Sequence, residues 1–296
     1  MHVFLTGATG HAGSAIQRKL VETDEKITAL VRSETAGARV WEDGATPLIG
    51  DITDMEWLRE ILPSFDAIVH TASPGDASSA TVDRDFAAAV IEAFAGTGKP
   101  YIHSSGAWNY GSGSHITEET PFDPPPTNVW RIDNDAMVAG APGMRGIVLM
   151  FGSMYGHGRG VLPNAIAASP RTGEDDWILI GDGSQHVATV HVDDLADLVV
   201  HALERGSSGY YIGASDDHPT NSELTEAASL GAGGSGTIKP ESRADTEARF
   251  GPALAAALLL DQQTSCAKAR DELGWSPSAT SLVEELAQGM YAAVSA

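Results

Sequence analysis

The chain has little cysteine, few basic residues and no long apolar run. Its single cysteine, Cys266, cannot form an intramolecular disulfide and has no cluster of metal ligands around it in the sequence. The 18 basic residues stand against 40 acidic ones and give a formal net charge of −22, which opposes binding to nucleic acid or to an anionic membrane. No signal peptide and no segment of membrane-spanning length is recognisable. We therefore expect a cytoplasmic protein with neither kind of partner.

Glycine, in contrast, is concentrated in the segment VFLTGATGHAG at residues 3–13. An apolar run ends there and three glycines follow before a helix that we expect to begin near His11; they are Gly7, Gly10 and Gly13. The missing side chains let backbone N–H groups approach a pyrophosphate, and the helix N-terminus adds partial positive charge. Because this loop directly follows the first strand, it favours a dinucleotide site over glycines that serve only turns or helix packing.

Strand and helix patterns alternate from this loop onward. Short β-rich runs without polar alternation are typical of parallel strands covered by helices on both faces. The expected strands lie at 3–7, 26–32, 46–51, 66–72, 99–105 and 145–152, and the helices at 14–22, 55–62, 85–96 and 132–139. The sequence therefore predicts an α/β fold: a Rossmann-type doubly wound parallel sheet with a smaller, partly interleaved C-terminal substrate domain.

The pattern loosens after residue 152, and this sets the expected domain boundaries. We assign residues 1–152 to the dinucleotide-binding domain, with 187–205 returning to it. Residues 153–186 and 206–296 form the smaller substrate-binding region, which closes over the carboxyl ends of the strands, where open α/β sheets bind ligands.

Seven segments in this order resemble the extended or atypical short-chain dehydrogenase/reductase superfamily, of the NAD-dependent epimerase/dehydratase kind. They are TGATGHAG at 6–13, GDITD at 50–54, HTAS at 70–73, HSSGAWNYG at 103–111, FGSMYGHG at 151–158, VHVDDLADLVVHAL at 190–203 and ARDELGWSP at 269–277. The resemblance covers nearly the whole chain and implies a cofactor site. Its pyrophosphate contacts would be Gly7, Thr9, Gly10, His11 and Ala12, its adenine contacts Asp51 and Ile52, and its remaining contacts Ala72, Ser73, Asn134, Phe151, Ser153 and Met154.

The end of the second strand bears on which dinucleotide binds. An acidic residue normally accepts hydrogen bonds from the adenosine ribose at this place, whereas this chain has Arg32. A guanidinium cannot accept those bonds, but it can hold a 2′-phosphate and stack on adenine. We therefore expect NADP(H) in preference to NAD(H); the alternative is that Arg32 is only a solvated charge at the strand end.

The proton-transfer residues of the resembled family are missing. The family carries a tyrosine and, four residues later, a lysine on one helical face, and the corresponding positions here are Trp130 and Asn134. An indole N–H does not titrate usefully, and an asparagine carries no charge, although it can hydrogen-bond a ribose. The candidate catalytic residues are Ser105, one place from the family's serine or threonine position, and Tyr155.

The same resemblance suggests a substrate pocket walled by aromatic and histidine side chains, namely Trp108, Tyr110, Trp130, His157 and His186, of which Tyr110 and His157 are further proton-donor candidates. We expect no metal site, because an N-capping role for Asp193 accounts for the acidic residues of VHVDD at 190–194.

These residues predict an NADP(H)-dependent oxidoreductase that acts on a small, rather apolar molecule without the usual tyrosine–lysine pair. Two alternatives stay open: a non-catalytic NADP(H)-binding sensor or regulator, and a sugar-nucleotide epimerase or dehydratase. The second is less favoured, since the later part of the chain offers few basic residues for a diphosphate. A homodimer is a further expectation, because members of the family often dimerise through helices.

Overall fold

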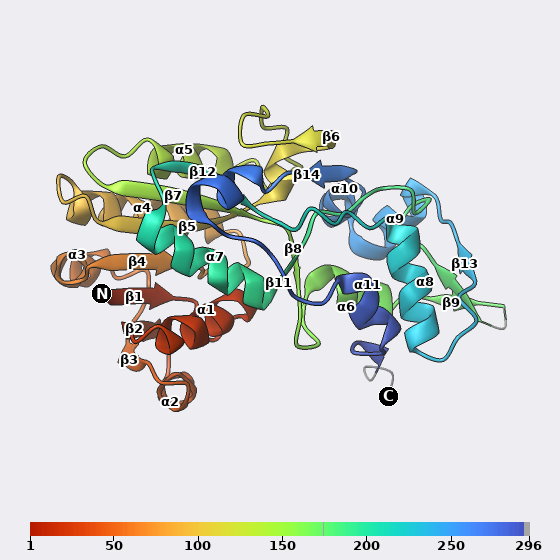
Figure 1. Cartoon of the computed structure of the whole chain (residues 1–296), viewed down its shortest axis with the longest axis horizontal. Coiled ribbons are helices and arrows are strands. Elements are labelled where there is room, and N and C mark those ends of the chain that lie inside the picture. Colours follow the sequence, from red (N-terminus) through yellow and green to blue (C-terminus); the bar gives the residue numbers. More distant parts are fainter. Residues whose placement is uncertain (174, 293–296) are drawn as a thin grey trace.

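A seven-stranded parallel sheet dominates the computed structural model, which describes residues 1–173 and 175–292 (Figure 1). The strand order is β12-β7-β5-β4-β1-β2-β3. The bounds are β1 His2–Thr6, β2 Lys26–Val31, β3 Thr46–Ile49, β4 Ala67–His70, β5 Pro100–Gly106, β7 Arg145–Phe151 and β12 Gly209–Gly213. The order reverses beside β1, so the carboxyl ends of β1 and β4 flank the crevice where doubly wound sheets bind nucleotides.

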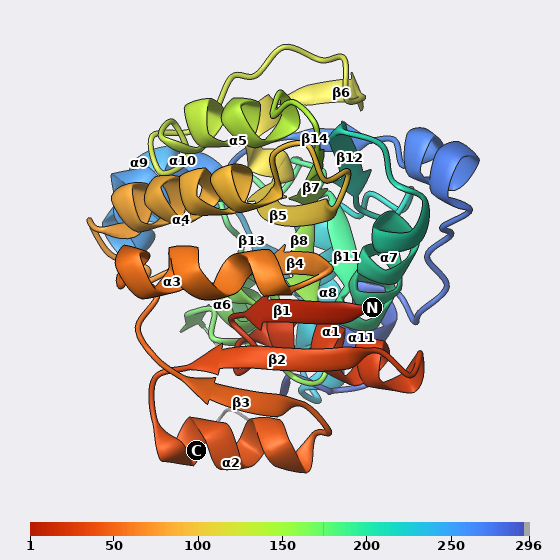
Figure 2. The same ribbon diagram turned by 90° about the vertical axis from the view of Figure 1, so that its left-hand side faces the viewer.

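Helices cover both faces of this sheet, as Figure 2 shows. One face packs against α1 (His11–Glu22) and α7 (Val192–Arg205), and the other against α3 (Met55–Ile61), α4 (Ser79–Phe94) and α5 (Arg131–Ala139). Strand side chains alternate between the two cores: Val3 and Leu5 enter the core under α1, and Phe4 enters the core under α4. Since both faces are buried, the strands need no polar alternation, which explains the sequence pattern.

The smaller region lies beyond the carboxyl ends of the large sheet (Figure 1). Its core is formed by apolar side chains such as Trp177, Leu224 and Leu286. Three small sheets stand apart from the large one: β8 Ser153–Tyr155 with β11 Thr189–His191, β9 Arg171–Thr172 with β10 Asp176–Ile178 and β13 Ile238–Lys239, and β6 Gly113–Ile116 with β14 Gln262–Thr264. The helices of the smaller region are α6 Val161–Ala167, α8 Asn221–Gly231, α9 Arg243–Phe250, α10 Pro252–Leu258 and α11 Leu282–Ala287, with short turns at Leu62–Ser64, Ala107–Tyr110 and Ala269–Leu273 elsewhere in the chain.

The Rossmann-type fold is confirmed, but three elements differ from the expectation. Helix α2 (Glu34–Glu42) was not indicated by the pattern, and α4 begins at Ser79 rather than at residue 85. The assignment of all of 206–296 to the smaller region is wrong, because β12 pairs with β7 as an edge strand of the large sheet. In the part of the chain that the structure describes, no helix is both long and apolar enough to cross a membrane.

Candidate functional site

The glycine loop joins β1 to α1 as the sequence predicts, and its packing requires glycine at two positions. Gly7 has a φ of +79°, and a Cβ there would lie 2.5 Å from Oγ1 of Thr71 and 2.8 Å from the Ala72 nitrogen. A Cβ on Gly13 would lie 2.1 Å from the Gly7 carbonyl oxygen. The first helical turn and the end of β4 therefore both pack directly against the loop backbone.

The start of α1 is open to an anion. Gly10 caps the helix without any side-chain hydrogen bond, and the first turn contains no acidic residue. The N–H groups of such a turn have no intrahelical partner and attract negative charge. A dinucleotide pyrophosphate therefore fits this helix end, with Gly10, His11 and Ala12 next to it.

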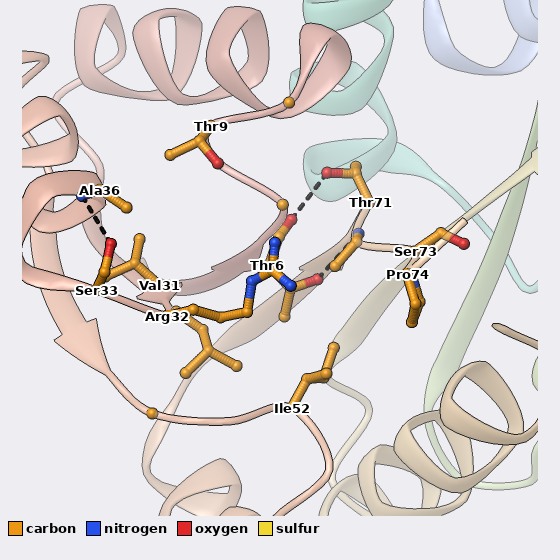
Figure 3. Close-up of a pocket in the computed structure, with 15 residues that line it drawn as sticks. Thr6, Thr9, Val31, Arg32, Ser33, Ala36, Ile52, Thr71, Ser73 and Pro74 are labelled. Atoms are coloured by element: carbon orange, nitrogen blue, oxygen red, sulfur yellow. Dashed lines mark hydrogen bonds between the residues drawn. The ribbon is translucent and has the colours of Figure 1, made fainter. Parts of the chain in front are cut away.

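A cavity of about 320 Å³ opens beside the loop, at the carboxyl ends of β1, β2 and β4 (Figure 3). Seven of the predicted cofactor residues line it: Gly7, Thr9, Gly10, Arg32, Ile52, Ala72 and Ser73. Figure 3 shows the Arg32 side chain pointing from the end of β2 into the cavity, near Ile52. Among the described residues that line this cavity, none is acidic.

Ser33 and Asp51 complete the surroundings of Arg32 in different ways. Ser33 lines the cavity and caps α2, accepting a 3.2 Å hydrogen bond from the Ala36 nitrogen. Asp51 is not among the lining residues, because its carboxylate accepts two 2.8 Å hydrogen bonds from Thr53. Those bonds, from the Thr53 backbone and hydroxyl, lower the pKa of Asp51. Of the two residues expected to contact adenine, only Ile52 therefore lines the cavity.

A second cavity of about 630 Å³ lies nearby: His11 lines it, and the preceding residue, Gly10, lines the first. It lies between the carboxyl ends of β5 and β7 and helix α6. The predicted residues that line it are Ser105, Trp108, Phe151, Ser153 and Met154 together with His11. A dinucleotide whose pyrophosphate sits at α1 can therefore extend its adenosine half into the first cavity and its nicotinamide half into the second.

Two arginines line the second cavity, contrary to the expectation of a pocket with few cationic groups. Arg131 begins α5 and stacks over the Trp130 ring at 4.3 Å, and Arg159 follows β8. Among the described residues neither forms an ion pair, and no acidic residue lines the cavity. The charge of the cavity lining is therefore positive, whereas the whole chain, with 40 acidic and 18 basic residues, is negatively charged. Sequence reasoning missed the pair because its members lie on separate elements.

Ser105 lies at the end of a buried polar network. Its Oγ is hydrogen-bonded at 2.6 Å to Oδ2 of Asp135, and the Asn109 amide donates to both atoms at 3.0 Å. Asn128 in turn donates to the Asn109 oxygen at 2.8 Å and lines the second cavity. Sequence reasoning missed Asp135 and Asn109, although the asparagine stands four residues after Ser105 in the motif HSSGAWNYG at 103–111.

The network continues from Asp135 beneath the sheet. Nε2 of His103 lies 3.3 Å from Oδ1 of Asp135 and 3.5 Å from Oδ2 of Asp83. On the far side, Nε2 of His70 lies 3.3 Å from Oδ1 of Asp83, and Nδ1 of His70 is 2.7 Å from Oγ1 of Thr6. Thr6 lines the first cavity, so the network connects the two cavities through the protein interior.

Asn134 belongs to this network rather than to either cavity. Its amide donates to Oδ2 of Asp83 at 2.8 Å and to the Ala80 carbonyl at 3.3 Å. The neighbouring Trp130 is half-buried and does not line the cavities; its ring carries the Arg131 guanidinium. The predicted ribose contact of Asn134 is therefore not supported by its position.

The tyrosine candidates for proton transfer lie outside the cavities. The Tyr155 hydroxyl donates to the Thr280 carbonyl at 2.8 Å and its ring packs edge-on against His191. Tyr110 packs against Phe122, and its hydroxyl is buried without a hydrogen-bond partner among the described residues. Burial raises the pKa of both phenols. This placement argues against either tyrosine as the proton donor.

The two predicted pocket histidines are also held by carboxylates. His186 is 2.9 Å from Asp261 and lines only a narrow cavity beside Trp108. His157 is exposed, and its Nε2 is 3.0 Å from the Asp193 carboxylate. The N-cap of α7 is His191, whose Nδ1 accepts from the Asp193 N–H, so the N-capping role expected for the Asp193 carboxylate is wrong.

His157, His191 and Asp193 place three ligand atoms within 4.8 Å of one another, close enough to share a cation. Both nitrogens of His191 are engaged, however, one with the Asp193 N–H and the other with Glu285 at 3.2 Å. A metal would have to displace one of these contacts, so the donor set is better described as a salt-bridge cluster.

The sheet order, the glycine turn without a side-chain cap and the two neighbouring cavities fit the Rossmann class of dinucleotide-binding folds. The chain belongs to the NAD dependent epimerase/dehydratase family, whose model matches residues 3–213. It is 30% identical over 98% of its length, and over 100% of the relative, to an uncharacterized protein of Schizosaccharomyces pombe. It is 25% identical to the sterol-4-alpha-carboxylate 3-dehydrogenase, decarboxylating, of Dictyostelium discoideum, over 70% of this chain and 69% of that one.

Among solved structures, the fold is similar to that of UDP-glucose 4-epimerase from Thermus thermophilus in complex with NAD. The TM-score is 0.75, both chains are covered over 100%, and the sequence identity is 18%. At this identity the likeness concerns the fold, and it agrees with the strand order given above.

Proposed function

We propose that this protein is an oxidoreductase that uses NADP(H). The observation that carries the cofactor choice is Arg32, which enters the first cavity with Ser33 where no acidic residue lines the described wall. A guanidinium and a hydroxyl at the end of β2 suit a 2′-phosphate, whereas they lack the carboxylate that accepts hydrogen bonds from both free ribose hydroxyls of NAD(H). The bound cofactor would supply a hydride in the second cavity, and the protein binds and orients both partners.

We further propose a small substrate with an apolar body and one anionic group. Trp108, Phe151 and Leu162 offer the apolar wall, and Arg131 and Arg159 offer charge and hydrogen-bond donors that suit a carboxylate or phosphate. The sterol carboxylate dehydrogenase named above has, by its name, a substrate of this kind. The two arginines add a charged group to the small, rather apolar substrate expected from the sequence.

The usual tyrosine–lysine pair has no place in this proposal. Trp130 does not line the cavities, and the Asn134 amide is committed to Asp83. Ser105 is the hydroxyl that lines the second cavity and is connected to buried acids, so it is the catalytic candidate that the geometry favours. Because the tyrosine–lysine pair is missing, we keep a second candidate function, that of a sensor that binds NADP(H) without turnover.

The test begins with binding. Fluorescence titration of the pure protein with NADPH and NADH is expected to give clearly tighter binding of NADPH, and equal affinities would overturn the cofactor proposal. A panel of carbonyl compounds, each with and without a carboxylate, and of nucleoside-diphosphate sugars is then screened for cofactor oxidation or sugar conversion. Preference for carboxylated carbonyls supports the substrate proposal. Tight NADPH binding without turnover of any compound favours the sensor, and turnover of the sugars favours an epimerase or dehydratase.

Two further expectations from the sequence stay predictions: the protein is located in the cytoplasm, and it forms a homodimer. Subcellular fractionation would check the location, and light scattering would check the oligomeric state. Neither affects the cofactor or substrate proposal.

A further inference from the structure

The two arginines of the second cavity come from different parts of the fold, and their surroundings differ. Arg131 begins α5; its Nη1 lies 3.4 Å from the Ser104 carbonyl oxygen, and its guanidinium stacks on Trp130 at 4.3 Å. Ser104 precedes Ser105, so these contacts hold Arg131 beside the catalytic candidate. Arg159 lies on the turn between β8 and α6, and its guanidinium has no hydrogen bond or ion pair to any residue that the structure describes.

The turn that carries Arg159 is fixed by hydrogen bonds to its backbone. The Arg159 N–H donates to the Gly156 carbonyl oxygen at 3.1 Å, and the Arg159 carbonyl accepts from the Tyr291 hydroxyl at 3.2 Å. The Gly156 N–H donates to the same Tyr291 oxygen at 2.9 Å. Gly156, His157 and Gly158 have φ angles of +115°, +55° and +68°, a conformation that glycine adopts without strain. The Arg159 side chain therefore starts from a defined backbone position.

His11 connects this turn to the start of α1. Its Nε2 lies 3.1 Å from the Gly156 carbonyl oxygen, which also accepts from the Arg159 N–H. A carbonyl oxygen only accepts, so Nε2 carries the proton of this hydrogen bond. Because both nitrogens are bonded to one oxygen atom, the Arg159 backbone lies next to the imidazole of the first α1 residue. Burial and the charge of Arg159 lower the pKa of His11, which places the guanidinium near the ring as well.

The place beside His11 is where a bound dinucleotide needs positive charge. The start of α1 supplies only a partial charge to the pyrophosphate, and the lowered pKa favours an uncharged His11. Among the described residues that line the first cavity, Arg32 is the one basic side chain, and it lies at the end of β2. The net charge of −22 opposes the approach of a polyanion. A guanidinium near His11 would offset this, since it matches phosphate oxygens in charge and in geometry.

We propose that Arg159 is a ligand of the cofactor and binds its pyrophosphate together with the start of α1. The smaller region thereby contributes a group to cofactor binding, and the hydrogen bond from His11 to Gly156 holds that group next to the glycine loop. Arg131, beside Ser104, is left to bind the anionic group of the substrate. The proposal deepens the proposed function and rests on its placement of the dinucleotide across both cavities. It does not depend on the choice between NADPH and NADH, which share the pyrophosphate.

Isothermal titration of the full chain tests the assignment. Arg159→Gln is expected to lower the affinities for NADPH and NADH by the same factor, about 10- to 100-fold, because each loses charge-assisted hydrogen bonds to its pyrophosphate. Adenosine 2′-monophosphate, which has no 5′-phosphate, should bind the variant and the wild type equally. Thermal unfolding without nucleotide should also be equal, since the guanidinium has no partner among the described residues, and this separates lost binding from lost folding.

Two further variants are the matched controls. Arg131→Gln removes the same charge from the same cavity, and Arg243→Gln removes it from an exposed position on α9. Both should keep the dinucleotide affinities of the wild type. Unchanged affinities in Arg159→Gln would overturn the proposal, as would a loss confined to NADPH or an equal loss in Arg131→Gln. Equal wild-type affinities for NADPH and NADH would overturn the cofactor preference of the proposed function, and the effect of Arg159→Gln on both nucleotides would still decide this proposal.

Discussion

The side-chain amide of Asn134 donates a 2.8 Å hydrogen bond to the buried carboxylate of Asp83. Asn134 stands where the resembled family has a lysine that contacts the cofactor ribose, so in this chain the position supports an interior network instead. At this position the family's lysine is therefore replaced by a residue that makes a hydrogen bond in the protein interior.

Replacing Asn134 by leucine is expected to destabilise the fold. The substitution removes a donor from a buried ionised carboxylate, a loss that typically costs about 1–3 kcal/mol in the free energy of unfolding. Urea unfolding followed by circular dichroism measures it. Asp133→Asn, a change at the exposed neighbouring residue, should stay within about 0.5 kcal/mol of the wild type. A stable Asn134→Leu protein would show that Asp83 does not depend on this bond.

The glycine loop allows the cost of a left-handed backbone conformation to be compared with the cost of a steric clash. Gly7 and Gly96 have φ angles of +79° and +74°, but only at Gly7 would a Cβ meet other atoms, at 2.5 Å from Thr71 and 2.8 Å from Ala72. Gly96→Ala is expected to cost about 1 kcal/mol for the backbone conformation alone. Gly7→Ala should cost more and should also weaken NADPH binding. Equal stability of the two variants, measured by thermal unfolding, would contradict the close packing of the loop.

The role of Arg32 is tested by its removal. Arg32→Ala should lower NADPH affinity roughly 10- to 100-fold, the usual effect of losing a charge-assisted hydrogen bond, and should leave NADH affinity nearly unchanged. Isothermal titration of both nucleotides measures the two effects. Arg39→Ala, at an exposed position on α2, is the control for net charge. An equal loss of affinity for both nucleotides would show instead that Arg32 contacts a part of the cofactor that NADPH and NADH share.

His191 gives the protein a pH-dependent contribution to stability. Burial lowers the pKa of His191, but the hydrogen bond with Glu285 at 3.2 Å and the nearby Asp193 outweigh this and raise it above 6.5. The stabilisation is therefore complete below pH 6.5, the ordinary histidine value, and is lost as the pH rises through the raised pKa. In Glu285→Gln this decline should largely disappear. Unfolding curves collected across neutral pH for both proteins check the prediction, and identical slopes would exclude the pair as its source.

Helix α2 shows where pattern reading fell short. Its sequence, ETAGARVWE, is short and contains a glycine and a threonine, both weak helix formers. The helix forms because Ser33 caps it and because Gly37 lets it pack against β3, where a Cβ would lie 3.3 Å from the Pro47 side chain. The packing on β3 is a tertiary contact, which local propensity does not weigh. The assignment of β12 failed for a related reason, since pairing with β7 depends on the whole sheet.

The sequence by itself determined the cofactor half of this protein. The run from Val3 to Gly13 defines a strand, a glycine turn and a helix start through steric and hydrogen-bonding rules that act over a few residues, and Arg32 marks the next strand end. Only the tertiary structure decided which side chains surround Ser105 and Asn134. Thr6, His70, His103 and Ser105 become neighbours through parallel strand register, and helices α4 and α5 bring two carboxylates to them. Such contacts join residues up to 64 positions apart, as between Thr6 and His70, and no local pattern in the sequence specifies them.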